Sequence, residues 1–213
     1  MIDKSKLICA TPFRYTDVFD DKQFLCCPGW LNVDVSEGKT IRENFNSKKS
    51  QNIRESILDG SYKYCDEKQC PHLSALTQDK FIDNRFIPKN HRTIKQFKLI
   101  SEIESVGFSF DRSCNLKCPS CRVDLINYLG KERKSVDIKL EELNNEISKT
   151  VKRMYITGTA DAFYSKSFRQ FLIDFEPSNY PKMQNIHIHT NGILWTEKLW
   201  NRMNGIHPFV KTC

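Results

Sequence analysis

The stretch VGFSFDRSCNLKCPSCR, residues 106–122, indicates the fold and the chemistry of this chain. Its first part alternates bulky apolar residues with small ones and predicts a β-strand that ends near Phe110. Its second part carries three closely spaced cysteines, Cys114, Cys118 and Cys121. Thiolates at such spacing suit zinc or an iron–sulfur cluster. Because an ordinary electron-transfer cluster uses four cysteines, a four-iron cluster held by this triplet has one iron left to bind something else.

Strand and helix patterns alternate along residues 103–213. The clearest helix, residues 167–175, repeats phenylalanine and leucine every three or four positions on one face. Alternation at this spacing predicts βαβ units and a parallel sheet, whose strands all end on one edge. The expected strands are 106–110, 151–156, 185–189 and 206–210, and the expected helices are 136–149, with Asp137 as N-cap, 167–175, and 196–203, with Thr196 as N-cap.

The composition is that of a globular protein with many thiols. The chain has 213 residues and a formal net charge of +7, and its 14 Phe, 7 Tyr and 3 Trp can fill a core, which excludes a disordered chain. The N-terminal apolar stretch is too short for a signal peptide, and no apolar run approaches the ~18 residues of a membrane span. We therefore expect a cytoplasmic protein without a membrane partner. Nine cysteines in a reducing compartment indicate metal binding or catalysis, although Cys213 stands alone.

The cysteine triplet after a strand resembles the cluster motif of the radical S-adenosylmethionine (SAM) superfamily. The resemblance covers about residues 103–213 and implies an α/β fold, a partial parallel β/α barrel. The family barrel has more strands than this chain supplies, so we expect a truncated core and a piece of a longer protein. The resemblance implies that the triplet holds a [4Fe–4S] cluster whose open iron binds SAM. Family enzymes cleave SAM reductively at that iron, and the resulting 5′-deoxyadenosyl radical abstracts hydrogen from a substrate.

Two further segments, at the ends of the second and third predicted strands, resemble the SAM-binding loops of the family. This resemblance implies which residues contact SAM. These contacts are Gly158, Thr159 and Asp161 after the second strand, and Thr190 and Asn191 after the third. Asp161 would either accept a hydrogen bond from the methionine ammonium or orient its loop. Family members often carry an aromatic residue before the third cysteine, where this chain has Ser120. The alternative for the triplet is a zinc site, with His187 or His189 as a further ligand.

Residues 1–80 form a separate, irregular α+β region rich in turns and cysteine, and residues 81–102 are expected to be a connector. The region resembles a SPASM or twitch domain, which holds an auxiliary iron–sulfur cluster. The ligands that this resemblance implies are Cys9, Cys26, Cys65 and Cys70. Cys27 is the alternate for Cys26, because adjacent side chains on an extended segment point to opposite faces. Within the region we expect a strand at 31–35 and a helix at 50–60 that ends at Gly60. A zinc-stabilised domain is the alternative.

These features together predict a radical SAM enzyme, an oxidoreductase or maturase-like protein, with an auxiliary cluster. The resemblance implies a peptide or small-molecule substrate and an electron donor such as ferredoxin or flavodoxin. The sequence identifies no catalytic residue. The competing function is a zinc-stapled nucleic-acid-binding protein without catalysis. The basic residues of this chain are spread along the sequence and form no patch. The aromatic residues Phe168, Phe171 and Phe175 follow a core-like helix face and not a platform for stacking bases. Neither pattern favours binding to nucleic acid.

Overall fold

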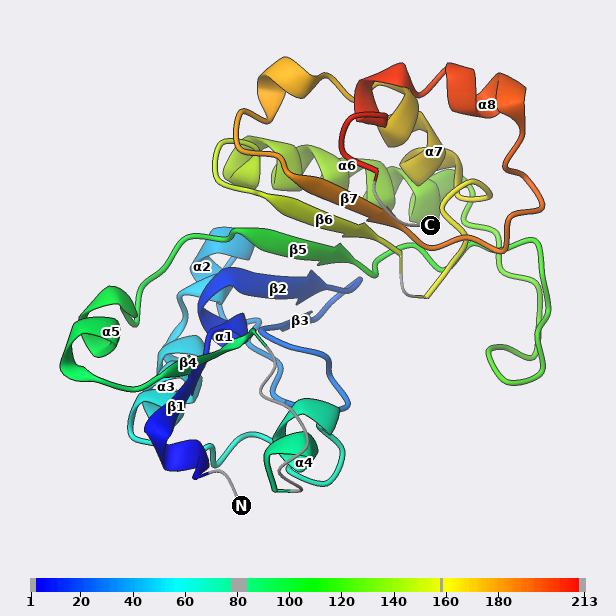
Figure 1. Ribbon diagram of the computed structural model, residues 1–213. Coiled ribbons are helices and arrows are strands. Elements are labelled where there is room, and N and C mark those ends of the chain that lie inside the picture. The colour runs from blue at the N-terminus through cyan, green and yellow to red at the C-terminus, as the bar shows by residue number, and fades with distance from the viewer. Residues whose placement is uncertain (1–2, 78–83, 158, 211–213) are drawn as a thin grey trace. The chain divides into compact units, whose positions relative to one another are not determined.

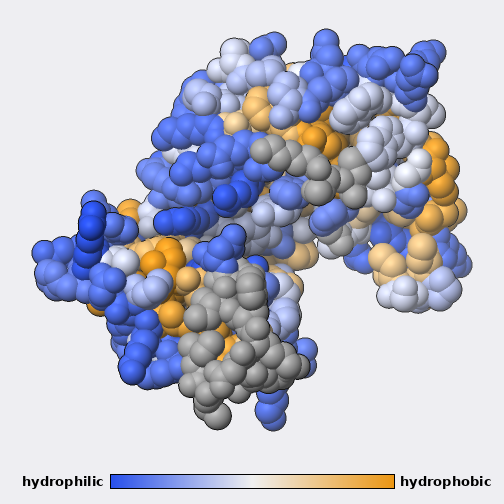
Figure 2. Space-filling view, viewed as in Figure 1, coloured by the Kyte–Doolittle hydropathy of each residue, from blue (hydrophilic) through white to orange (hydrophobic). Residues whose placement is uncertain are grey.

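The computed structural model describes residues 3–77, 84–157 and 159–210, and it divides into two compact units (Figure 1). The first unit contains residues 1–17 and 21–103, and the second contains residues 18–20 and 104–213. Each unit has a buried apolar core. The face drawn in Figure 2 is mostly hydrophilic, with separate apolar areas between, in keeping with a mean hydropathy of −0.54.

The first unit is a mixed α+β arrangement of short elements. Leu7–Cys9 (β1) pairs in antiparallel register with Phe86–Pro88 (β4), so that Cys9 lies opposite Phe86. The remaining elements are η1 (Lys4–Lys6), α1 (Thr11–Arg14), β2 (Tyr15–Val18), β3 (Gln23–Phe24), α2 (Ile41–Phe45), α3 (Lys48–Leu58), α4 (Pro71–Thr77) and α5 (His91–Gln96). The expected helix is therefore present as α3, and Gly60 follows it with a φ of +88°, a conformation that glycine adopts readily.

A buried arginine on α3 joins distant segments of the first unit. The guanidinium of Arg54 donates to the carbonyl oxygens of Pro12 (2.9 Å) and Phe45 (2.7 Å). It also lies over the Phe45 ring, 4.3 Å from its centroid. Burial lowers the pKa of Arg54 to about 9. Backbone oxygens therefore stand in for water around this cation, and they fix α1 beside α3.

The second unit is α/β, with three neighbouring strands in parallel. Ser105–Phe108 (β5) pairs with Arg153–Ile156 (β6), which pairs with Asn185–Ile188 (β7). Helices α6 (Gly130–Ile147) and α7 (Lys166–Ile173) connect these strands and cover one face of the sheet (Figure 1). The Phe168 ring of α7 packs against Phe108 and Phe110, which buries the apolar stripe predicted for this helix. The unit ends with η2 (Pro177–Asn179), α8 (Glu197–Asn201) and η3 (Asn204–Ile206).

Several expectations for secondary structure are wrong. Residues 31–35 form no strand, although Leu31 and Val35 are buried. The Leu31 amide donates within a turn to the Cys27 carbonyl oxygen (3.0 Å), and the Val35 amide donates to the Gln23 carbonyl oxygen (2.9 Å). Helix α6 begins at Gly130, so Asp137 lies inside it and is no N-cap. Thr196 does cap α8 by accepting from the Leu199 amide.

Other expectations hold in part. The segment expected as a fourth strand makes one parallel bridge, Ile186 to Val210. The expected connector contains β4 and α5 within the first unit. The mixed α/β fold with a parallel sheet agrees with a partial β/α fold, while the barrel itself stays a prediction.

Candidate metal and cofactor sites

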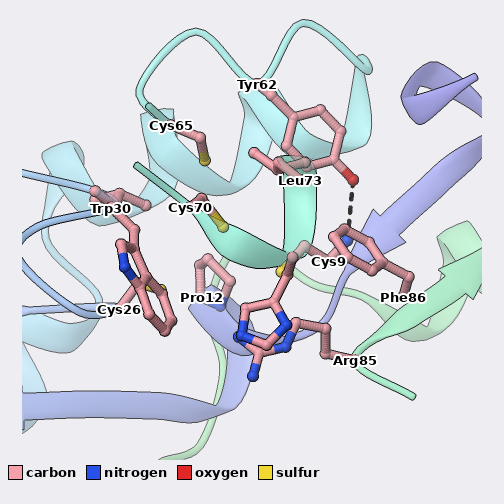
Figure 3. A pocket seen from close by; sticks show the side chains of 12 residues that line it. Cys9, Pro12, Cys26, Trp30, Tyr62, Cys65, Cys70, Leu73, Arg85 and Phe86 are labelled. Carbon is pink, nitrogen blue, oxygen red and sulfur yellow. Dashed lines mark hydrogen bonds between the residues drawn. The ribbon is translucent and has the colours of Figure 1, made fainter. Parts of the chain in front are cut away.

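Four cysteines from separate parts of the first unit line one small cavity (Figure 3). Cys9 ends β1, Cys26 follows β3, Cys65 lies in the turns after α3, and Cys70 directly precedes α4. All four are free thiols, and each is buried or half-buried. These are the four positions that the sequence selected as ligands. Cys27, the alternate for Cys26, is not among the residues that line the cavity.

Tyr62 positions two of these cysteines. Its φ of +51° lies in the left-handed region, which non-glycine residues seldom occupy, and its ring is buried. The Tyr62 hydroxyl donates to the Leu7 carbonyl oxygen (2.9 Å) and accepts from the Cys9 amide (3.1 Å). The Tyr62 carbonyl oxygen accepts from the Cys65 amide (2.9 Å). One tyrosine therefore links β1 to the turn that carries Cys65.

A second set of backbone bonds closes the cavity from the other side. The Asp66 amide donates to the Trp30 carbonyl oxygen (2.8 Å), and the Cys70 amide donates to the Asp66 carbonyl oxygen (2.9 Å). The Trp30 ring meets His72 edge-on at 5.2 Å, and the Arg85 guanidinium lies 5.9 Å from the Trp30 ring centroid. The thiols are thus enclosed by aromatic and aliphatic side chains, with one cation nearby.

Burial raises the pKa of the Cys9 and Cys26 thiols, and it raises the pKa of Cys65 to about 12. The neighbouring thiols add to this rise, since a second thiolate close by would repel the first. Without a metal these groups are protonated at neutral pH. Metal ligation requires thiolates, so binding releases protons and becomes tighter as the pH rises.

The geometry of the thiols bears on which metal they suit. In the part of the chain that the structure describes, no three His, Cys, Asp or Glu side chains converge as a single-ion site would need. A zinc ion draws its ligands around one centre, whereas each cysteine of a four-iron cluster binds a different iron. The cavity holds about 20 Å³, so the side chains that line it would have to move apart to admit a cluster. The donor set of four soft thiolates fits an iron–sulfur cluster or zinc.

The cysteine triplet lies in the loop between β5 and α6 of the second unit. Cys114 is buried, and its amide donates to the Ile126 carbonyl oxygen (2.9 Å) across a short antiparallel bridge. Cys118 and Cys121 are exposed, and a turn joins them through the Cys121 amide and the Cys118 carbonyl oxygen (2.9 Å). The donor set therefore consists of one fixed, buried thiol and two accessible ones.

Arg122 connects the triplet loop to the loop after β6. Its guanidinium donates to the carbonyl oxygens of Arg112 (2.7 Å) and Thr159 (2.7 Å), and one nitrogen lies 3.5 Å from the Cys121 Sγ. Arg122 thus lies between the third cysteine and the loop after β6. Sequence reasoning missed this residue, and its adjacency to the third cysteine was the available signal.

Asp161 is a buried hub of hydrogen bonds at the same edge of the sheet. Only 1% of it is exposed. One carboxylate oxygen accepts from the amides of Phe163 (3.0 Å) and Tyr164 (2.9 Å). The other accepts from the Thr190 hydroxyl (2.7 Å) and the Asn191 amide (2.7 Å). These four bonds orient the loops after β6 and β7, which is one of the two expected roles, while contact with the methionine ammonium stays a prediction.

The two loops that the sequence selected thus meet the triplet loop. The Asp161 amide donates to the Ser113 carbonyl oxygen (3.0 Å). The Asn191 side chain donates to the Asn115 side-chain oxygen (2.8 Å) and lies 3.9 Å from the Cys114 Sγ. Thr159 lies near the triplet loop through Arg122, while Gly158 lies outside the described residues, as does Cys213. Neither His187 nor His189 joins two cysteines in a metal-binding group among the described residues; His187 instead stacks on Tyr155.

A second buried carboxylate supports this edge and was missed by sequence reasoning. Asp111 accepts from the Ser113 amide (2.7 Å) and from the Ser165 hydroxyl. The Ser165 hydroxyl in turn accepts from the Phe168 amide (3.1 Å) and caps α7. Asp111 therefore ties the triplet loop to the start of the helix that follows the Asp161 loop. The Asp-x-Ser pattern directly before Cys114 was its signal in the sequence.

Alkylation rates test this description of the thiols. In the metal-free chain at pH 8, we expect iodoacetamide to modify Cys118 and Cys121 much faster than Cys9 and Cys26. The first pair is exposed, whereas burial limits access to the second pair and raises their pKa. Peptide mapping by mass spectrometry gives each rate, and urea-unfolded protein is the control in which the four rates should converge. Fast labelling of Cys9 and Cys26 in the folded chain would contradict the enclosed cavity.

Comparison with known proteins gives one partial relative. The chain is 34% identical over 98 residues to 7-carboxy-7-deazaguanine synthase from Aquifex aeolicus (strain VF5), which covers 45% of this chain and 40% of that enzyme. This similarity to a radical SAM enzyme supports the radical SAM superfamily. The chain spans about two fifths of the length of the relative that it matches. No family model matches the chain, and no solved structure does.

The helices also bear on a membrane role. Among the residues that the structure describes, none of the helices combines the length and apolar character needed to cross a bilayer.

Proposed function

We propose that this chain binds a [4Fe–4S] cluster and SAM at the loop edge of its second unit and belongs to an enzyme of the radical SAM type. The observation that carries the proposal is the hydrogen-bonded network that joins the Cys114 loop to Asp161 and Asn191. When bound, the cluster supplies the electron that cleaves SAM reductively. Cys114, Cys118 and Cys121 would hold it, and three cysteines leave one iron for the cofactor.

The chain's own residues supply position and shielding. Asp161 fixes the loop after β6 and the loop after β7 in one arrangement. The Arg122 guanidinium donates to the Thr159 carbonyl oxygen and lies 3.5 Å from the Sγ of the third cysteine, Cys121. Thr159, Thr190 and Asn191 would then contact SAM, together with Gly158. These loops follow neighbouring parallel strands, the edge where such sheets place their active sites.

The four thiols of the first unit are proposed to hold an auxiliary cluster. The support for this proposal is that Cys9, Cys26, Cys65 and Cys70 all line one small cavity. With four cysteine ligands such a cluster is fully ligated, which suits electron transfer or a structural role. A zinc ion at the same thiols is the alternative, and it would accompany the competing function, a nucleic-acid-binding protein without catalysis.

We further propose a peptide or protein substrate, on the resemblance of residues 1–80 to a SPASM or twitch domain. The name of the partial relative describes the synthesis of a small molecule, so a small molecule is the alternative. The electron donor is proposed to be a ferredoxin or flavodoxin, and the location is proposed to be the cytoplasm.

Anaerobic reconstitution followed by iron counting and electron paramagnetic resonance tests these proposals. We expect about eight irons per chain, as two four-iron clusters require, and a signal that changes when SAM is added. Cys26→Ala should lose about half of the iron, whereas Cys27→Ala should keep all of it. About four irons per chain, with zinc bound at the first unit, would mean that the first unit is a structural zinc domain and holds no auxiliary cluster. A colourless, air-stable protein with zinc alone would favour the binding protein instead.

A further inference from the structure

Two side chains outside the cysteine triplet direct N–H groups at its sulfur atoms. One nitrogen of the Arg122 guanidinium lies 3.5 Å from the Cys121 Sγ. The side-chain nitrogen of Asn191 lies 3.9 Å from the Cys114 Sγ. Arg122 directly follows the triplet, whereas Asn191 belongs to the loop after β7. Two of the sulfurs that would bind iron are therefore themselves within reach of donors from separate loops.

Backbone oxygens hold the half-buried Arg122 guanidinium in place. Its Nη1 donates to the Arg112 carbonyl oxygen (2.7 Å), and its Nη2 donates to the Thr159 carbonyl oxygen (2.7 Å). Nη2 carries two hydrogens, so the second one is available to the Cys121 Sγ. A guanidinium is a permanent cation. The sulfur of Cys121 therefore has a fixed positive charge beside it.

The Asn191 side chain is oriented by its own hydrogen bonds. Its Oδ1 accepts from the Ile193 amide (3.0 Å), a group that can only donate, so the other terminal atom is Nδ2. Nδ2 donates one hydrogen to the Asn115 Oδ1 (2.8 Å), and its second hydrogen is available to the Cys114 Sγ. The Asp161 carboxylate accepts from the Asn191 backbone amide (2.7 Å). The side chain is thus held with an N–H group toward the sulfur.

Hydrogen bonds to cysteine sulfurs change the reduction potential of an iron–sulfur cluster. Reduction adds one electron, and part of the added negative charge lies on the sulfur ligands. A cation or an N–H dipole beside these sulfurs therefore stabilises the reduced state more than the oxidised state, which raises the potential. Hydrogen bonds with a charged partner are about twice as strong as neutral ones. The effect of Arg122 should accordingly exceed that of Asn191.

We propose that Arg122 and Asn191 are positioning residues that raise the reduction potential of the cluster at the triplet, an inference that rests on the proposed function. In the step concerned, one electron passes from the donor, a ferredoxin or flavodoxin, to the cluster. The donor is oxidised, the cluster is reduced, and no bond forms or breaks. Because Arg122 also bonds to Thr159 and Asn191 belongs to the loop after β7, the loops that would contact SAM also determine how readily the cluster accepts this electron.

Potentiometric titration with dithionite, followed by electron paramagnetic resonance in the absence of SAM, measures the midpoint potential. The parent is the whole chain with Cys26→Ala, which should keep only the cluster at the triplet. We expect Arg122→Gln to shift the potential to more negative values, because the cation beside the sulfur is lost. Asn191→Leu should shift it in the same direction by less. An unchanged potential in both variants would overturn the inference.

Two further variants separate contact with the sulfur from other effects of the substitution. Lys117→Gln removes the same charge from the triplet loop, but the Lys117 ammonium pairs with Asp124 (3.4 Å), so the potential should stay unchanged. Arg122→Lys keeps the charge and loses the fork that reaches two carbonyl oxygens. Its potential should return toward that of the parent, while its free energy of unfolding stays reduced. An equal shift in Lys117→Gln, or no recovery in Arg122→Lys, would contradict the inference.

The iron content of the parent distinguishes failure of this inference from failure of the proposed function. A parent with about four irons, whose variants show no shift in potential, would contradict the inference alone. A parent without iron at the triplet would contradict the proposed function, and the inference with it. Circular dichroism checks that each variant is folded, and Arg122→Met removes the same charge if Arg122→Gln does not fold.

Discussion

Alanine in place of Cys114, Cys118 and Cys121 together is expected to abolish every spectroscopic response to SAM. The cofactor binds the iron that three cysteine ligands leave open, so the response is lost with those ligands. The variant should retain about four irons at the first unit, because Cys9 and its three partners line a separate cavity. Iron counting and electron paramagnetic resonance with and without SAM measure both effects.

Two results would contradict this expectation. A SAM-dependent signal in the triple variant would place the cofactor at other residues. Loss of all iron in the triple variant would mean that the first unit holds no cluster. Cys27→Ala is the matched control, since Cys27 belongs neither to the triplet nor to the cavity lining.

Asp161→Asn is expected to destabilise the second unit by about 3 kcal/mol, because it leaves buried donors without acceptors. Each carboxylate oxygen of Asp161 accepts two hydrogen bonds, and the amide nitrogen of asparagine can accept none of them. Urea unfolding of the metal-free chain measures the change in the free energy of unfolding. Asp21→Asn, at an exposed residue, is the control and should change it by no more than about 0.5 kcal/mol.

The same variant tests the link between Asp161 and the cysteine loop. Asp161 holds the Asn191 amide, and the Asn191 side chain lies against Cys114 and Asn115. Loosening of this link should expose Cys114 and speed its alkylation, while labelling of Cys9 in the other unit stays slow. An unchanged Cys114 rate together with an unchanged free energy of unfolding would show that the network is unimportant.

The sequence predicted those elements whose stability depends on a strong local pattern. Helix α7 repeats apolar side chains on one face, and β5, β6 and β7 are runs that end at polar loops. Helix α6 was predicted with the wrong start, because its first turns are mostly charged and show no apolar period. Strands β1 and β4 were missed, because three-residue strands gain their order from a pairing partner far along the chain.

In the candidate sites, too, the sequence predicted what a local pattern encodes and missed what depends on contacts between distant segments. Cysteine spacing selected the four residues that line the cavity, while the metal-binding role of the triplet stays a prediction. Spacing could not show that Cys26 faces the cavity and Cys27 does not, since that depends on how the chain turns at Pro28 and Gly29. The loop-fixing roles of Asp111 and Arg122 depend on contacts across the sheet edge, which no local pattern encodes.

The proposed metal centre at the four thiols of the first unit would impose an order on maturation. During synthesis Cys9 leaves the ribosome first, and its last partner, Cys70, follows only after most of the unit has been made. A metal centre that needs all four can therefore close only late, when α3 has formed and Tyr62 has drawn β1 against the turn at Cys65. Until then the early cysteines stay open to oxidation. If the centre is the proposed cluster, the supply of iron and the pace of translation together determine how much of the newly made chain acquires it.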